Sequence, residues 1–168
     1  MGSLEQMQSR NQYEFVIYQC TTLTQLKWAE GTLEQATTED IELVQEWCES
    51  FRIEAQIAIL QNVDQITRQV EQGIVYLRAT DCPVSTVVSS RGTENIVAIS
   101  AVYTPPKYRN NGYATAQTAA VTQKILNSGK KRAVLYTDLD NPTSNSIYQQ
   151  IGYKPFSDST VWLFSPAL

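Results

Sequence analysis

One stretch, residues 102–115, constrains the fold more than any other part of the chain. It reads Val-Tyr-Thr-Pro-Pro-Lys-Tyr-Arg-Asn-Asn-Gly-Tyr-Ala-Thr, between an apolar β-branched run at 95–102 and a helical pattern at 113–127. The sequence therefore predicts a strand, a turn with two prolines, a loop containing Gly112 and the start of a helix. Such a loop directs backbone N–H groups at one point beside the positive end of a helix dipole, and glycine lets an anion approach closely. With Arg109 beside it, the loop suits a phosphate or diphosphate.

The rest of the chain alternates between strand and helix patterns. Strands are predicted at residues 14–22, 31–36, 74–79, 84–90, 95–103 and 133–139, and a hairpin at 153–156 and 160–164. Helices are predicted at residues 37–55, 62–73, 113–127 and 142–151. The strands between 74 and 103 are typical of an antiparallel meander. The strand at 14–22 is expected to pair at a sheet edge or with a second chain.

Length and composition limit the class of protein. The 168 residues correspond to one domain, placed at residues 13–168, with residues 1–12 expected to be disordered or tag-like. A net charge of −4 disfavours nucleic acid as a partner. The chain has no histidine and three widely spaced cysteines, so no metal site is expected. We also expect no membrane segment and no signal peptide, and therefore a cytoplasmic location.

Two motifs are similar to those of the GNAT superfamily of N-acetyltransferases. Arg109-x-x-Gly112-x-Ala114 resembles its acetyl-CoA signature, Gln/Arg-x-x-Gly-x-Gly/Ala. Residues 141–153 resemble its second motif, in which Asn141 is followed by Tyr148 and then by a glycine and an aromatic residue. The motifs occur in the family's order, and the resemblance covers about residues 31–164.

The resemblance implies more about the fold than periodicity, which indicates only a mixed α/β or α+β protein. It implies the α+β GNAT acyl-CoA acyltransferase fold, a central splayed mixed sheet flanked by about four helices. Residues 99–106 and 136–145 look closest to a bacterial subgroup whose members often carry a further N-terminal half. Because the strand at 14–22 would then lack a partner, a homodimer is a possible assembly.

The resemblance also implies the cofactor-binding residues. Main-chain N–H groups and one hydroxyl of the loop and first helical turn would hold the diphosphate of acetyl-CoA: Arg109, Asn110, Asn111, Gly112, Tyr113, Ala114 and Thr115. Val102 and Tyr103 would pair with the pantetheine arm and polarise the thioester carbonyl. Asn141 and Ser144 would line the arm, and Asn141 would in any case cap the helix that it begins.

Tyr148 is the predicted catalytic residue and a further contact of the cofactor. It lies seven residues after Asn141, on the same helix face. In the family this tyrosine can protonate the departing thiolate, and the alternative is that it only packs beneath the cofactor. Four carboxylates are candidate bases for the amine, although the interpretation as a solvated charge is favoured for each: Glu54, Asp81, Glu94 and Asp138.

These features predict an N-acetyltransferase that moves the acetyl group of acetyl-CoA to a primary amine by direct attack in a ternary complex. The alternative is a catalytically inactive acyl-CoA-binding regulatory module. A P-loop nucleotide binder is disfavoured because no Gly-Lys-Ser/Thr follows the loop. The expected partners are acetyl-CoA and an amine acceptor, and the sequence does not identify that amine.

Overall fold

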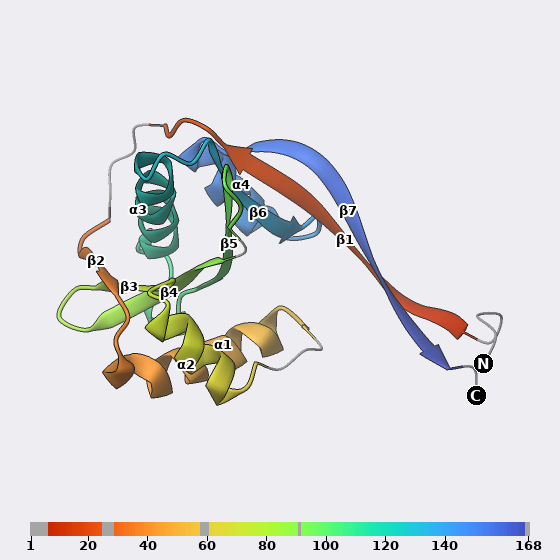
Figure 1. Ribbon diagram of the computed structural model, residues 1–168, viewed down its shortest axis with the longest axis horizontal. Helices are drawn as coiled ribbons and strands as arrows, with labels where there is room; N and C mark the ends of the chain where they lie inside the picture. Colours follow the sequence, from red (N-terminus) through yellow and green to blue (C-terminus); the bar gives the residue numbers. More distant parts are fainter. Residues whose placement is uncertain (1–6, 25–28, 58–60, 91, 167–168) are drawn as a thin grey trace.

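A seven-stranded mixed sheet carries helices on both faces (Figure 1). The computed structural model describes residues 7–24, 29–57, 61–90 and 92–166. Its strands are β1 (Met7–Cys20), β2 (Thr32–Gln35), β3 (Val75–Ala79), β4 (Pro83–Ser90), β5 (Ile96–Tyr103), β6 (Arg132–Asp138) and β7 (Lys154–Pro166). Its α-helices are α1 (Ile41–Glu54), α2 (Val63–Glu71), α3 (Tyr113–Asn127) and α4 (Pro142–Ile151). The mixed α+β class is confirmed.

The strand order is β2-β3-β4-β5-β6-β1-β7. Strands β3 to β5 form the predicted antiparallel meander, β2 adds to it antiparallel to β3, and β5 and β6 are paired in parallel. A parallel pair needs a crossover, which α3 supplies. None of the helices in the described ranges is long and apolar enough to cross a membrane.

The two faces of the sheet have separate cores because side chains alternate along each strand. On β3, Val75 and Leu77 pack with Val44 and Trp47 of α1 and with residues of α2. Tyr76, which lies between them, belongs to the second core, with residues of α3, α4, β1 and β6. All five residues of β3 are buried, as expected for a strand that is covered on both faces.

Local signals placed the helix starts correctly. The Asn62 side chain caps α2 by accepting a hydrogen bond from the Gln65 N–H at 2.9 Å. The Gln65 side-chain oxygen in turn accepts a hydrogen bond from the Asn62 N–H at 3.0 Å. This is the capping box that the sequence predicts. Asn141 caps α4 in the same way, accepting from the Ser144 N–H at 3.0 Å.

The N-terminal strand differs from its prediction. β1 lies inside the sheet, antiparallel to β6 over Phe15–Cys20 and to β7 over almost its whole length. β6 and β7 of the same chain thus supply its partners, where the sequence left open a sheet edge or a second chain. Residues 7–12, expected to be disordered, belong to β1, because pairing with β7 satisfies their backbone groups without an apolar pattern. Residues 1–6 lie outside the described range.

The predicted C-terminal hairpin is also wrong. Residues 154–166 form one strand, β7, which pairs with β1 and extends with it as a two-stranded ribbon beyond the rest of the sheet (Figure 1). The sequence Ser157-Asp158-Ser159 resembles a turn, but these residues stand opposite Ile17, Val16 and Phe15 of β1. A register shift beside Ile17 and Tyr18 absorbs the irregularity near Phe156.

Candidate functional site

The sheet divides between β5 and β6. These strands pair only over Ile96–Ile99 and Arg132–Leu135. Beyond that point β5 continues along β4 as far as Tyr103, and β6 continues along β1 as far as Asp138. The splayed sheet that the resemblance implied is therefore present, with its opening at the C-terminal ends of two parallel strands. Ligands of open α/β sheets bind at such an edge.

A β-bulge interrupts β5 at this opening. Thr86 of β4 stands opposite Tyr103 and Val88 opposite Ser100, so that one β4 residue faces both Ala101 and Val102. Ala101 has a φ of 48°, a left-handed conformation that costs a non-glycine residue about 1–2 kcal/mol. Bulges of this kind redirect backbone groups and often occur beside active sites. No sequence signal marks Ala101, which the prediction missed.

Buried polar groups hold the end of β5 and connect it to α3. The Ser85 hydroxyl donates to the Tyr103 carbonyl at 2.9 Å and accepts from the Thr104 hydroxyl at 2.9 Å. The fully buried Gln117 of α3 donates from Nε2 to the carbonyls of Tyr76 and Ser85, at 2.9 and 3.2 Å. Sequence reasoning missed Ser85 and Gln117, because their roles depend on contacts across three elements.

Two residues of the loop between β5 and α3 have left-handed backbone conformations. A short 3-10 helix over Pro106–Tyr108 leads into Asn110 and Gly112, whose φ angles are 65° and 74°. Asparagine is one of the few non-glycine residues that tolerate this region. The Asn111 side chain donates to the carbonyls of Tyr108 and Arg109, at 3.1 and 3.0 Å, and thereby braces the loop.

The start of α3 differs from those of α2 and α4. No side chain caps it within the described structure, and its first turn carries no acidic residue. A Cβ built on Gly112 would meet only the Cβ of Ala29, at 3.7 Å. The N–H groups of Tyr113, Ala114 and Thr115 thus stand at an uncapped positive helix end, which fits a diphosphate.

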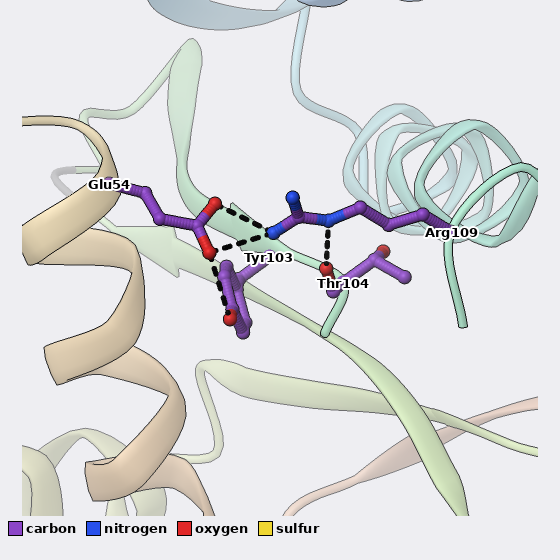
Figure 2. Close-up of polar contacts among 4 residues, drawn as sticks. All are labelled: Glu54, Tyr103, Thr104 and Arg109. Atoms are coloured by element: carbon purple, nitrogen blue, oxygen red, sulfur yellow. Dashed lines mark hydrogen bonds and ion pairs between the residues drawn. The ribbon is translucent and has the colours of Figure 1, made fainter. Parts of the chain in front are cut away.

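The Arg109 side chain has partners within the chain that the sequence did not indicate. Its guanidinium forms an ion pair with Glu54 at the end of α1, at 2.9 and 2.6 Å from the two carboxylate oxygens (Figure 2). Its Nε donates to the Thr104 carbonyl at 2.9 Å, and its Cζ lies 5.8 Å from the centre of the Tyr103 ring. The Tyr103 hydroxyl donates to Glu54 at 3.3 Å. Tyr103 is therefore a packed residue that also orients this carboxylate.

Tyr148 lies in the core, in the C-terminal half of α4. Its ring is 9% exposed and packs against Tyr18 and Tyr153, with centroids 6.4 and 6.1 Å away. Burial raises the pKa of Tyr148 to about 12, and a hydrogen bond with the Ser144 side chain offsets part of that rise. Because Ser144 lies one turn earlier, the phenol points toward the N-terminal end of α4.

The two predicted motifs meet at the same edge of the sheet. β5 and β6 are parallel, so the helices that follow them, α3 and α4, both begin at the C-terminal edge. Both helices contribute to the same core, and so cover the same face. The Gly112 loop and the Asn141 cap therefore stand on the two sides of the β5–β6 opening.

The four candidate bases are separated by the fold. Glu54 contacts site residues, whereas Asp138 ends β6 and accepts a hydrogen bond from the Asp140 N–H at 2.8 Å. Asp81 is exposed in the turn between β3 and β4, at the same edge of the sheet as Tyr103. Glu94 precedes β5 and lies at the opposite edge, so it is excluded as a base for chemistry at the opening.

Comparisons with known proteins agree with this fold. The sequence profile of the FR47-like protein family matches residues 77–163, just over half of the chain. A search of curated proteins finds no significant match. A GNAT-family protein from Novosphingobium aromaticivorans superposes with a TM-score of 0.75 at 14% identity, covering 100% of this chain and 71% of that one.

Two further structures extend the comparison. A GCN5-related N-acetyltransferase from Sphaerobacter thermophilus has a TM-score of 0.73 at 17% identity, covering 95% of this chain but 54% of its own. A predicted acetyltransferase from Clostridium acetobutylicum, solved with acetyl-CoA, has a TM-score of 0.59 at 14% identity, covering 76% of this chain and 92% of its own. The chain thus spans only part of several longer relatives. From the profile match and the fold together, the chain belongs to the FR47-like proteins of the GNAT superfamily of N-acetyltransferases.

Proposed function

We propose that the protein transfers the acetyl group of acetyl-CoA to a primary amine by direct attack in a ternary complex. One observation carries the proposal: an uncapped helix start with Gly112 and a capped one with Asn141 flank the β5–β6 opening. The bulge at Ala101 lies between them. A helix start that suits an anion, the end of the β5–β6 pairing and a buried phenol would thereby act together at one edge of the sheet.

Different residues at this edge of the sheet would bind different parts of acetyl-CoA. The N–H groups of Tyr113, Ala114 and Thr115 would hold the diphosphate at the positive end of α3. Bound acetyl-CoA would supply an activated thioester. A backbone N–H at Val102 or Tyr103, redirected by the bulge, would donate to its carbonyl, a contact worth about 3 kcal/mol per donor. Asn141 and Ser144 would line the other side of the opening.

The raised pKa of Tyr148 refines its proposed role. Complete proton transfer from a phenol of pKa about 12 to a thiolate whose conjugate acid has a pKa near 8.5 would cost about 5 kcal/mol. A hydrogen bond from the neutral phenol to the leaving sulfur has no such cost, and the phenol stays protonated throughout the physiological range. We therefore propose that Tyr148 stabilises the leaving sulfur as a hydrogen-bond donor.

Direct attack is favoured over a covalent acyl-enzyme because two of the three cysteines are poor nucleophiles and no histidine activates the third. Burial raises the pKa of Cys20 and raises that of Cys48 to about 11, so both remain thiols at neutral pH. Cys82 is exposed, and its sulfur lies 3.3 Å from the Tyr108 hydroxyl. The chain has no histidine to activate a serine or cysteine.

The test combines two measurements on the whole chain. Calorimetric titration measures acetyl-CoA binding, and a thiol reagent measures CoA release with a panel of primary amines. Binding together with amine-dependent release supports the transferase. Binding without release from any amine would instead indicate an acyl-CoA-binding module, and absence of binding would refute both.

A further inference from the structure

The partners of the Arg109 guanidinium form a binding site for a cation. A carboxylate (Glu54), a main-chain carbonyl (Thr104) and the face of an aromatic ring (Tyr103) converge on one positive group (Figure 2). These three kinds of group are the ones that bind organic cations in proteins. The Tyr103 hydroxyl orients the carboxylate through its own hydrogen bond to Glu54 Oε1 at 3.3 Å.

The Arg109 guanidinium, which occupies this site, is accessible to displacement by another cation. The side chains of Arg109 and Glu54 are 42% and 46% exposed, so solvent reaches both charges. Exposed ion pairs add little to stability, because water screens them and the long side chains lose freedom. Another cation can therefore replace the guanidinium on Glu54 without disturbing the fold.

The site lies close to the proposed reaction centre but on the other face of the sheet from α3 and α4. Tyr103 directly follows the bulge of β5 and packs against Trp47 of α1, with ring centroids 6.5 Å apart. Glu54 is the last residue of α1. A molecule that reaches the bulge from the α1 face therefore passes beside Glu54.

We propose that Glu54, with Tyr103 and the Thr104 carbonyl, binds a second cationic group of the acceptor, in the place that Arg109 occupies in the free protein. The inference rests on the proposed acetyl transfer and names its substrate class: amines that carry a further positive charge. The reacting nitrogen must be neutral to attack, and a carboxylate beside it would favour its charged form. Glu54 therefore suits a nitrogen that stays charged throughout the reaction.

Arg109 competes with any external cation for the Glu54 carboxylate. It is the first residue of the loop that leads to Gly112, so an anion bound on that loop offers its guanidinium a different partner. The two anions, Glu54 and the loop-bound group, then compete for one cation. Removal of Arg109 is expected to open the cation site, and removal of Glu54 to abolish it.

The test is titration of the protein, without acetyl-CoA, with 1,4-diaminobutane and with pentylamine, which have equal numbers of heavy atoms. The natural sequence should bind the diamine about three- to fivefold more tightly, as expected for one exposed charge pair. Glu54→Gln should reduce the preference to less than about twofold. Arg109→Gln should instead strengthen diamine binding, because the competing guanidinium is gone.

Glu49→Gln is the matched control. It removes the same charge from α1 and breaks an ion pair of 2.7 Å with Arg52, away from Tyr103. It should leave the diamine preference unchanged. The proposal is overturned if Glu54→Gln keeps the preference, or if Glu54→Gln and Arg109→Gln shift it in the same direction, as loss of a merely structural bridge would.

Thiol release with the same two amines separates this inference from the proposed function. If neither amine releases CoA but diamine binding depends on Glu54, acetyl transfer fails and the cation site stands. If CoA is released and the ratio of KM values for the two amines is the same in Glu54→Gln, the cation site is refuted and the transferase stands.

Discussion

Replacement of Gly112 by aspartate separates the role of this residue in the fold from its role in binding. Gly112 has a φ of 74°, which aspartate and asparagine tolerate better than other side chains. A Cβ at this position meets only Ala29, at an ordinary contact distance of 3.7 Å. Gly112→Asp and Gly112→Asn should therefore each cost about 1 kcal/mol of stability, a Tm decrease of about 2–4 °C for a chain of this size.

The effect on binding should be much larger for the charged variant. Two unit charges about 5 Å apart at an effective dielectric constant of about 20 repel by about 3 kcal/mol. This corresponds to about a hundredfold loss of acetyl-CoA affinity in Gly112→Asp relative to Gly112→Asn. The two variants have nearly the same size and shape, so the difference between them isolates the charge.

Calorimetric titration measures the acetyl-CoA affinity of each variant, and thermal unfolding measures its stability. The gap between the two affinities should narrow as salt is added, because the repulsion is screened. Equal affinities for the two variants, with both folded, would show that no anion binds at this loop and would remove the basis of the proposed function.

Three further predictions concern Tyr148 and the glycine that ends α4. Tyr148→Phe should lower kcat by about a hundredfold and leave acetyl-CoA affinity unchanged, and an unchanged kcat would exclude the proposed hydrogen bond to sulfur. Because burial raises the Tyr148 pKa from about 10 to about 12, its contribution to stability is fully present below pH 10 and lost as the pH rises to 12. Urea unfolding across that range should show a loss that is about 3 kcal/mol larger in the natural sequence than in Tyr148→Phe, because the buried Tyr153, whose pKa is also raised, contributes to both; equal slopes would contradict the burial argument. Gly152→Ala should destabilise by about 2–4 kcal/mol, because φ is 114° and the new Cβ would lie 2.8 Å from the Thr22 carbonyl oxygen. Gly129→Ala is the control, because φ is 88° there and no atom lies within 4 Å of the new Cβ, so it should cost only about 1 kcal/mol. Equal losses of stability in Gly152→Ala and Gly129→Ala would show that the contact with Thr22 relaxes freely.

The features that the sequence predicted well depend on neighbours along the chain. The Asn62–Gln65 capping box, the Asn141 cap and the bounds of α3 follow from residues within one or two turns of each other. The loop at Gly112 belongs to the same class, because Gly112 and the helix after it are adjacent, whereas its binding of an anion stays a prediction. Recognition of the two motifs then supplied the splayed sheet, which periodicity could not indicate.

The features that the sequence did not predict depend on distant partners. β1 looked like an isolated strand because its neighbours, β6 and β7, come more than a hundred residues later. The apparent turn at residues 157–159 is straightened by pairing with β1, since ladder hydrogen bonds outweigh weak turn propensity. The Ala101 bulge requires a mismatch with β4 that no local pattern encodes.

By itself, the amino-acid sequence determined the helices and most of the strands, the resemblance to the family and the loop at Gly112, because short-range hydrogen bonding and backbone preferences act on adjacent residues. Only the tertiary structure decided where β1 inserts, that Tyr148 is buried and that Glu54 holds Arg109, 55 positions away in the chain. Strand pairing and desolvation decide these points, and both depend on which surfaces meet when the chain folds.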